Sequence, residues 1–197
     1  MCNHLSYLDI PVIGGVIPDS FVSKDDVAKW PVIGFLAGLR HTAYVVRGSA
    51  DPITASSSVE ARLANAENLI IFPEGTSTDG LGVREFKRGV FARALDVKND
   101  SLKIQPVTFN VVKANGKPLL TQEDRDIYAW HIGMDDSYTL PKHLWHFAQS
   151  KGAELRLIFH APIKVSDYDD RKMLAKDTHI AVSKGLENPI QRASAVN

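Results

Sequence analysis

Residues 69–76 read Leu69-Ile70-Ile71-Phe72-Pro73-Glu74-Gly75-Thr76, four apolar side chains followed at once by a turn. A continuous apolar run of this length indicates a strand that is buried on both faces of a sheet. Proline and glycine around Glu74 predict a tight, exposed turn that presents backbone N–H groups and one carboxylate to a substrate. Loops at the carboxyl ends of parallel strands bind ligands in open α/β sheets. Taken alone, the same residues fit an ordinary strand-to-loop turn with a solvated glutamate equally well.

Short β-rich runs alternate with helical patterns on both sides of this stretch. The apolar and β-branched runs predict strands over residues 20–23, 41–47, 69–72, 104–112 and 155–159. The helical patterns fall over residues 25–39, 58–65, 87–98, 141–149 and 169–186. This alternation predicts an α/β fold, a single domain whose largely parallel central sheet is flanked by helices. We expect the domain to cover residues 1–190, to be short at its N-terminus, and to end in a disordered tail over 191–197.

Composition excludes several functional classes. The chain has 197 residues, which is enough for one hydrophobic core. Its 23 Lys and Arg residues balance its 23 Asp and Glu residues, so the net charge does not favour binding to nucleic acid. Any attraction for phosphate must therefore come from a local group of basic residues. Cys2 is the only cysteine, which excludes an internal disulfide framework and a cysteine-rich metal site. The seven histidines lack the spacing of a zinc helix, so we expect no metal. No apolar run approaches the roughly 18 residues that cross a bilayer.

His4 and Asp9 are the candidate catalytic residues. A histidine can take a proton from an attacking hydroxyl, while a carboxylate on its other ring nitrogen fixes the tautomer and stabilises the imidazolium. A separation of five residues does not place two side chains on one helix face. The pair can meet if His4 lies in a loop before a helix over 7–13 that ends at Gly14-Gly15. The spacing alone is a weak signal, because a second pair, His131 and Asp136, has it too.

Four ordered blocks of sequence distinguish the two pairs. They are Asn3-His4-Leu5-Ser6-Tyr7-Leu8-Asp9, Tyr44-Val45-Val46-Arg47, Phe72-Pro73-Glu74-Gly75-Thr76 and Ile104-Gln105-Pro106-Val107. In order and spacing they resemble the lysophosphatidic acid acyltransferase family over roughly the first 110 residues. Phe86-Lys87-Arg88-Gly89 is similar to the basic stretch that follows the third block of that family. The later run Tyr128-Ala129-Trp130 is similar to bacterial members, including lyso-ornithine-lipid acyltransferases.

The resemblance implies a role for each matching residue. His4 would be the general base and Asp9 its orienting partner. Arg47 would contact the phosphate of the acceptor, since a guanidinium binds phosphate as a bidentate fork. Without the family context Arg47 also fits a surface ion pair at the end of a strand.

The remaining blocks would complete the substrate site. Glu74 and Gly75 would help position the glycerol moiety, with Thr76 in the same substrate-binding turn. Lys87 and Arg88 would add positive charge near a helix start. Pro106 would shape the acyl-donor side, and its place in a strand-like run puts that part at an edge or bend. Many relatives have an arginine after the threonine of the third block, where this chain has Ser77, which weakens the case for lysophosphatidic acid specifically.

These features predict transfer of a fatty acyl group from acyl-CoA or acyl carrier protein to a hydroxyl of 1-acylglycerol-3-phosphate or a related lysolipid. The hypothesis is direct transfer without a covalent acyl-enzyme and without a bound cofactor or metal. Lyso-ornithine-lipid acylation is the alternative acceptor. We expect a peripheral protein on the inner, cytoplasmic face of the cytoplasmic membrane.

The sequence is also compared with two rival functions, a hydrolase and a lipid-binding module. A serine hydrolase or thioesterase needs a Gly-x-Ser-x-Gly elbow, which is absent, and Ser6 is too close to His4 to make a good nucleophile. A catalytically inactive lipid-binding module at the membrane surface could place the apolar stretch 30–39 against lipid. Liposome binding without acyl transfer would favour that second rival.

Overall fold

The structure is a computed structural model that describes residues 1–24, 43–45, 59–97, 99–131 and 133–186. In chain order its elements are α1 (Asp9–Val16), β1 (Ser20–Lys24), β2 (Ala43–Val45), β3 (Leu69–Ile70), α4 (Gly89–Asp96), β4 (Lys103–Ile104), β5 (Val107–Ala114), β6 (Lys117–Pro118), α5 (Gln122–Asp126), α6 (Leu140–Gln149), β7 (Ala153–Phe159), β8 (Ile163–Lys164), the 3₁₀ helix η2 (Val165–Asp167) and α7 (Arg171–Leu186). Residues 59–64 are also helical. Within these ranges no helix is both long and apolar enough to span a bilayer.

The described strands form three small sheets. β1 pairs in parallel with both β2 and β3, which gives the order β2-β1-β3. The longest pairing joins β5 to β7 and is antiparallel, and β6 extends it to the order β6-β5-β7. β4 and β8 form a separate antiparallel pair. The fold is therefore a mixture of helices and strands as expected, but a largely parallel central sheet is not confirmed.

β7 runs antiparallel to β5 because β5 finishes and β7 begins at the same end of the sheet. The last residue of β5 faces the first residue of β7, Ala114 opposite Ala153. Directly beyond them the Asn115 N–H donates to the Gly152 carbonyl at 2.8 Å, and Asn115 Oδ1 accepts the Lys151 N–H at 3.0 Å. The chain thus leaves β5 and returns to β7 at the same end of the sheet, and the residues between them, 115–152, include β6, α5 and α6. Alternation of strands and helices does not encode that return, because helices can also lie within a hairpin excursion.

Residues 1–3 connect the two three-stranded sheets. Cys2 forms a parallel bridge with Val107 at the start of β5. Its N–H donates to the carbonyl of Ile71, just beyond β3, at 3.0 Å, and the Val107 N–H donates to the Met1 carbonyl at 2.8 Å. The chain therefore enters the first sequence block held by strands on both sides.

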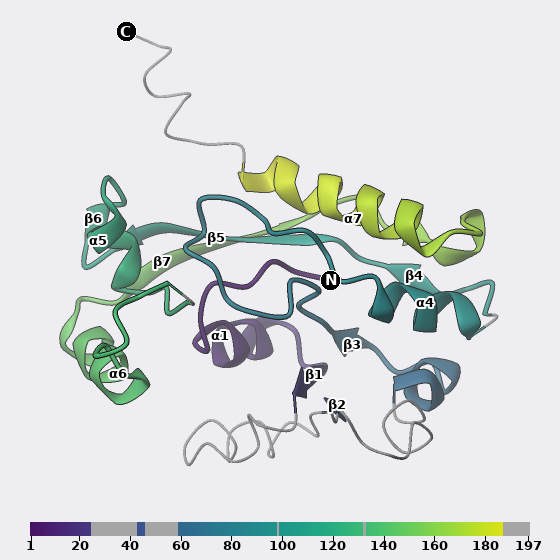
Figure 1. Ribbon diagram of the computed structural model, residues 1–197, viewed down its shortest axis with the longest axis horizontal. Coiled ribbons are helices and arrows are strands. Elements are labelled where there is room, and N and C mark those ends of the chain that lie inside the picture. Colours follow the sequence, from purple (N-terminus) through teal and green to yellow (C-terminus); the bar gives the residue numbers. More distant parts are fainter. Residues whose placement is uncertain (25–42, 46–58, 98, 132, 187–197) are drawn as a thin grey trace, which may run out of the picture.

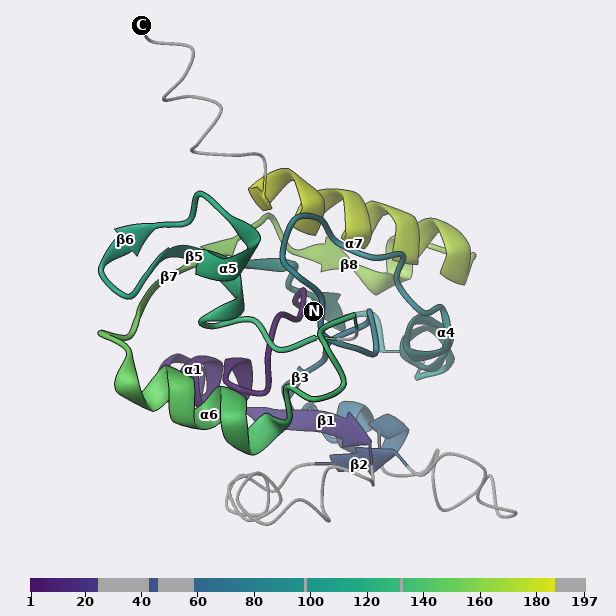
Figure 2. The same cartoon turned by 60° about the vertical axis from the view of Figure 1, so that its left-hand side comes forward.

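Helices pack on both sides of the antiparallel sheet (Figures 1 and 2). α7 lies along one side of β5 and β7, and α1 lies on the other side. One hydrophobic cluster gathers around α1 and β5 and includes Ile13, Phe21 and Phe109, all almost fully buried. A second cluster lies between α4 and α7, with Phe91 and Leu174 at 0% exposure. Burial of these apolar surfaces holds α1, and with it Asp9, against the sheet.

Most of the expected elements are present near their predicted bounds. The expected strands at 20–23 and 155–159 appear as β1 and β7, and the expected helices at 87–98, 141–149 and 169–186 appear as α4, α6 and α7. The helix expected over 25–39 and the tail over 191–197 lie outside the described residues. β6, α5 and β8 were not predicted. For α5 a signal was present, since Thr121 and Asp124 form a capping box at its start.

Two further expectations concern single residues. The strand expected over 104–112 is interrupted, because β4 ends at Ile104 and β5 begins at Val107, so Pro106 lies at a bend as predicted. The helix after His4 does not end at Gly14-Gly15 but continues to Val16. A β-carbon at Gly14 would lie 3.3 Å from the ring of Phe21, so close packing of β1 on α1 offsets the low helix propensity of glycine.

Packing of α7 on β5 yields a stability prediction at Gly185. A β-carbon there would lie 2.5 Å from the β-carbon of Thr108 and closer still to its hydroxyl. Thr108 has little room to move, because its hydroxyl donates to the Val182 carbonyl at 2.5 Å and lies 2.8 Å from His160 Nε2. We expect Gly185→Ala to lower the free energy of unfolding by about 1–3 kcal/mol in urea titrations.

The matched control is Gly15→Ala in α1, where a β-carbon would meet nothing within 4 Å. That change should be neutral or should stabilise by up to about 1 kcal/mol, the helix-propensity difference between alanine and glycine. Equal effects of the two substitutions would contradict the close approach of α7 to β5.

Candidate active site

His4 and Asp9 lie together at the end of the first connecting segment. His4 Nδ1 is 2.8 Å from Asp9 Oδ2, and the two side chains are 18% and 0% exposed. An ionised carboxylate can only accept a hydrogen bond, so Nδ1 carries the proton and Nε2 keeps its lone pair. The imidazole therefore has its unprotonated nitrogen on the partly exposed side of the pair, an orientation in which a histidine can accept a proton.

Asp9 is bound tightly by the loop it faces. Its Oδ2 also accepts the backbone N–H of Leu5 at 2.7 Å and of Ser6 at 3.1 Å. Its Oδ1 accepts the hydroxyl proton of Tyr128 at 3.0 Å. Asp9 is also the first residue of α1, where negative charge interacts favourably with the helix dipole. These contacts give both oxygens of the fully buried carboxylate hydrogen-bond donors.

Aromatic stacking holds the imidazole of His4 on one face. The ring lies 4.2 Å from the ring of Phe72, centroid to centroid, with an angle of 19° between the planes. Phe72 in turn stacks on Phe21 of β1 at 6.1 Å. The apolar residue before the third-block turn therefore supports the base from the first block.

Glu74 braces the loop of His4 and is not exposed. One carboxylate oxygen accepts the His4 N–H at 2.8 Å and the other accepts the Arg84 N–H at 2.7 Å. The tight turn itself forms as predicted, with the Gly75 N–H donating to the Phe72 carbonyl at 3.0 Å. The expectation of an exposed carboxylate is wrong, because Glu74 is 2% exposed and both of its oxygens are used by backbone donors. Glu74 therefore connects the loop of His4 to the loop of Arg84 through hydrogen bonds.

The buried position of Glu74 predicts a pH-dependent stability. Burial raises the pKa of Glu74 from about 4.5 to about 7, outweighing the two N–H donors and His4, which lower it. The folded chain thus holds this proton more tightly than the unfolded chain, so its contribution to stability is lost as pH rises from about 4.5 through about 7. Between pH 5 and pH 8 we expect the wild type to lose about 2 kcal/mol more free energy of unfolding than Glu74→Gln, in urea titrations. Parallel losses in the two proteins would contradict the assignment.

Lys87 lies across the turn that contains Gly75. Gly75 has a left-handed backbone with φ of 69°, which favours glycine. A β-carbon at Gly75 would lie 3.0 Å from both Cδ and Cε of Lys87, and the Lys87 N–H donates to the Pro73 carbonyl at 2.9 Å. The structure therefore brings the ammonium of Lys87 beside the third block.

The other predicted site residues have different surroundings. Thr76 is half-buried in the loop after the turn, and Arg88 is exposed and pairs with Glu85 at 3.0 Å. Pro106 is buried, and its carbonyl accepts the His160 N–H at 3.0 Å. Arg47 lies outside the described residues.

The structure also bears on the competing candidates. Ser6 is fully buried, so its hydroxyl is not presented to a substrate as a nucleophile would be. His131 Nε2 lies 3.5 Å from the carboxylate of Asp126. Among the described residues, no group of three or more His, Cys, Asp or Glu side chains is placed to hold a metal ion.

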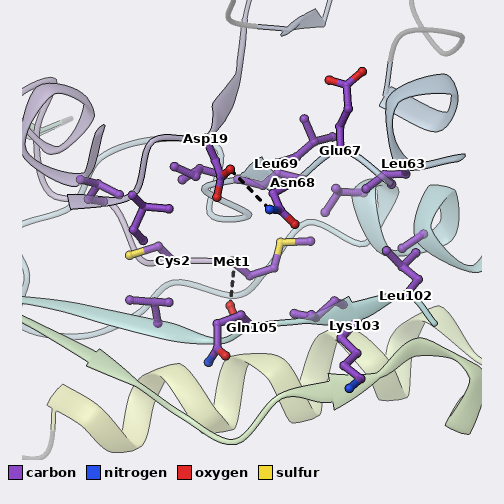
Figure 3. Close-up of a pocket in the computed structure, with 18 of the residues that line it drawn as sticks. Met1, Cys2, Asp19, Leu63, Glu67, Asn68, Leu69, Leu102, Lys103 and Gln105 are labelled. Atoms are coloured by element: carbon purple, nitrogen blue, oxygen red, sulfur yellow. Dashed lines mark hydrogen bonds between the residues drawn. The ribbon is translucent and has the colours of Figure 1, made fainter. Parts of the chain in front are cut away.

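A separate apolar cavity of about 340 Å³ lies beside Met1 (Figure 3). Its walls include Ile70, Ile71 and Ile104. The α-amino group of Met1 donates to the Gln105 carbonyl at 3.0 Å at its edge. Met1 and Cys2 line this cavity, but His4 and Asp9 are not among its lining residues, so the cavity is separate from the dyad.

Sequence comparison identifies the family. A family model described as Acyltransferase matches residues 1–110, which contain both members of the dyad, Glu74 and Pro106. The chain belongs to the acyltransferase family. The resemblance read from the four sequence blocks is thereby confirmed.

Two relatives of this acyltransferase-family chain differ in the acceptor for which they are named. It is 37% identical to a lyso-ornithine lipid O-acyltransferase of Rhodobacter capsulatus, over 94% of this chain and 64% of that protein. It is 30% identical to a 1-acyl-sn-glycerol-3-phosphate acyltransferase of Neisseria meningitidis serogroup B, over 87% of this chain and 62% of that protein. The chain thus spans less than two thirds of the length of either relative.

A solved structure supports the fold. The crystal structure of the 1-acyl-sn-glycerophosphate (LPA) acyltransferase PlsC from Thermotoga maritima superposes with a TM-score of 0.59 at 21% identity. The match covers 94% of this chain and 63% of that chain. At this identity the similarity establishes a shared fold.

Several residues around the dyad were not predicted from the sequence. The Thr78 N–H donates to the His4 carbonyl at 2.9 Å, and the Trp130 N–H donates to the Leu5 carbonyl at 3.1 Å. Asn3 is fully buried and exchanges two hydrogen bonds with the backbone of Phe109, at 2.7 and 2.9 Å. For Asn3 its place before His4 was a signal, whereas nothing local connects the other two to the first block.

Proposed function

We propose that this chain transfers a fatty acyl group from a thioester to the free hydroxyl of a lysolipid. The observation that carries the proposal is the dyad, in which Asp9 holds Nδ1 of His4 and leaves Nε2 free on the partly exposed side. The acyltransferase match over residues 1–110 supports the reaction class. The names of the relatives support a lysolipid acceptor.

The proposed reaction is a direct displacement. His4 Nε2 takes the proton of the acceptor hydroxyl, whose oxygen attacks the thioester carbonyl carbon. The new C–O bond gives a tetrahedral oxyanion, which collapses to the ester as the C–S bond breaks, and the leaving thiolate takes the proton from the imidazolium. Asp9 stabilises the imidazolium between these two steps. Backbone N–H groups of the first or third block would stabilise the oxyanion.

Charged residues near the third block would bind the head group of the acceptor. Lys87 lies beside Gly75, and Arg88 follows it. With Arg47 from the second block they would supply the positive charge for an anionic group such as a phosphate. Glu74 would act on the glycerol side through the backbone of His4 that it holds. Thr76 would line the same turn, and Pro106 would shape the acyl-donor side.

Two acceptors are proposed, each favoured by a relative. The Rhodobacter relative is named for lyso-ornithine lipid and the Neisseria relative for 1-acyl-sn-glycerol-3-phosphate. Ser77 replaces the arginine expected after the third block, which favours testing lyso-ornithine lipid beside the phosphate-bearing acceptor. Acyl-CoA and acyl carrier protein are the proposed donors, with no bound cofactor. The enzyme would be a peripheral protein at the cytoplasmic face of the membrane, where it would meet both substrates.

An assay of the purified protein tests the function. Lyso-ornithine lipid and 1-acylglycerol-3-phosphate are each presented in mixed micelles with radiolabelled acyl-CoA and, separately, with the radiolabelled acyl thioester of acyl carrier protein. We expect His4-dependent formation of a diacyl product with at least one acceptor. Liposome binding without transfer to either acceptor would overturn the proposal in favour of a lipid-binding module. Trapping of acyl-serine with the labelled donor would favour a hydrolase instead.

A further inference from the structure

Tyr128 is a fully buried tyrosine in the turn that follows α5. Its ring packs against Phe109 of β5, with centroids 5.8 Å apart, and edge-on against Phe147 of α6 at 5.9 Å. Its backbone N–H donates to the Arg125 carbonyl at 2.9 Å, which turns the main chain back onto α5. Two aromatic neighbours and the end of a helix thus fix the position of its hydroxyl.

That hydroxyl contacts the oxygen of Asp9 that His4 does not use. Oδ2 accepts from His4 and from two backbone N–H groups, whereas Oδ1 accepts from Tyr128 at 3.0 Å. Rotation about the terminal bond of an aspartate is soft, since that torsion is broad. A donor fixed on Oδ1 restricts this rotation and keeps Oδ2 directed at the imidazole.

The same hydrogen bond affects the charge that His4 meets. Burial and the neighbouring carboxylate of Asp9 raise the pKa of Tyr128 far above its ordinary value, so the hydroxyl keeps its proton at every working pH. A donor on Oδ1 draws negative charge away from Oδ2. Without this hydrogen bond, Asp9 would stabilise the protonated imidazole of His4 more strongly. The imidazolium would then give up its proton less readily.

We infer that Tyr128 is a positioning residue of the acyl-transfer site, whose hydroxyl sets both the orientation of Asp9 and the charge that Asp9 presents to His4. The activity part of this inference rests on the proposed function. The contacts on which it is built belong to the dyad itself.

The test is Tyr128→Phe, which removes one oxygen and keeps the ring. We expect kcat to fall about 10- to 100-fold, as for a small misplacement of a catalytic group, while KM changes less than about twofold. The acidic limb of the pH–rate profile should move to higher pH, because Asp9 then holds the imidazolium more strongly. The ring ¹⁵N shifts of His4 at fixed pH should change in the same protein.

The matched control is Tyr168→Phe. Tyr168, which follows η2, also donates its hydroxyl to a carboxylate, that of Asp177 within α7, at 2.8 Å. This variant should leave kcat, the pH profile and the His4 signals unchanged. A purely structural role of Tyr128 would scale the rate equally at every pH, and that result, or an unaltered rate, would overturn the inference.

Failure of this inference can be told apart from failure of the proposed function. If the unmodified chain transfers no acyl group, the function is refuted, and the ¹⁵N shifts of His4 still decide the role of Tyr128. If Tyr128→Phe does not fold, 3-fluorotyrosine at position 128 keeps the ring and hydroxyl but donates a stronger hydrogen bond. The acidic limb should then move to lower pH, and a limb that stays in place would count against the inference.

Discussion

Replacing His4 with alanine is expected to lower acyl transfer about 10²- to 10⁴-fold, the usual contribution of a general base. Its Nε2 is the ring nitrogen left free by the contact with Asp9. The backbone of His4 carries the contacts to Glu74 and Thr78, and alanine keeps both. The loss should therefore appear in kcat while the thermal unfolding midpoint stays close to that of the wild type.

The measurement compares initial rates of diacyl-lipid formation at saturating donor, with His146→Ala as the control. His146 is an exposed histidine on α6 that contacts the hydroxyl of Tyr138 at 2.7 Å, outside the dyad. This variant should keep the wild-type rate. Full transfer by pure, folded His4→Ala would remove the general base from the mechanism and the dyad from the site.

The second large effect is expected for Asp9→Asn, again about 10²- to 10⁴-fold in kcat. The amide oxygen can occupy the place of Oδ2 and still accept from Leu5, Ser6 and His4 Nδ1. The amide NH₂ can occupy the place of Oδ1 and donate to Tyr128, whose hydroxyl can also accept. The geometry is thus retained and the negative charge is lost, so the imidazolium is no longer stabilised.

Circular dichroism and thermal unfolding should accordingly show a folded Asp9→Asn protein. Asp9→Ala provides the contrast, because it leaves two buried backbone N–H groups and the Tyr128 hydroxyl without an acceptor. Each lost acceptor costs about 1–3 kcal/mol, so Asp9→Ala should be clearly less stable than Asp9→Asn. Wild-type activity in Asp9→Asn would show that charge at this position is not required.

The regular elements were predictable where the local pattern was strong. The periodic apolar residues of α4, α6 and α7 and the β-rich runs of β1 and β7 each lie within one short stretch of chain. The sheet direction was not predictable in this way. It depends on the end of the sheet at which the chain returns after β5, and the contact of Asn115 with Gly152 lies at the end where β5 finishes and β7 begins.

In the site, too, the short-range patterns were predictable and the contacts between distant residues were not. His4, Asp9 and the 72–76 turn are short-range patterns, and the structure brings them together through the contact of Glu74 with the His4 backbone. The direction in which Glu74 points was not readable, because burial depends on packing of the loop that carries Arg84. Tyr128 is 119 residues from Asp9, and no spacing rule connects residues so far apart.

By itself the sequence determined the family, the alternation of helices and strands, and the residue types of the proposed chemistry, because these depend on neighbours within a few positions. Only the tertiary structure decided that Glu74 faces inward, that Asp9 is shared between His4 and Tyr128, and that the longest strand pair is antiparallel. The physical reason is that buried polar groups must find partners wherever the chain brings them, and those partners come from loops far apart in the sequence.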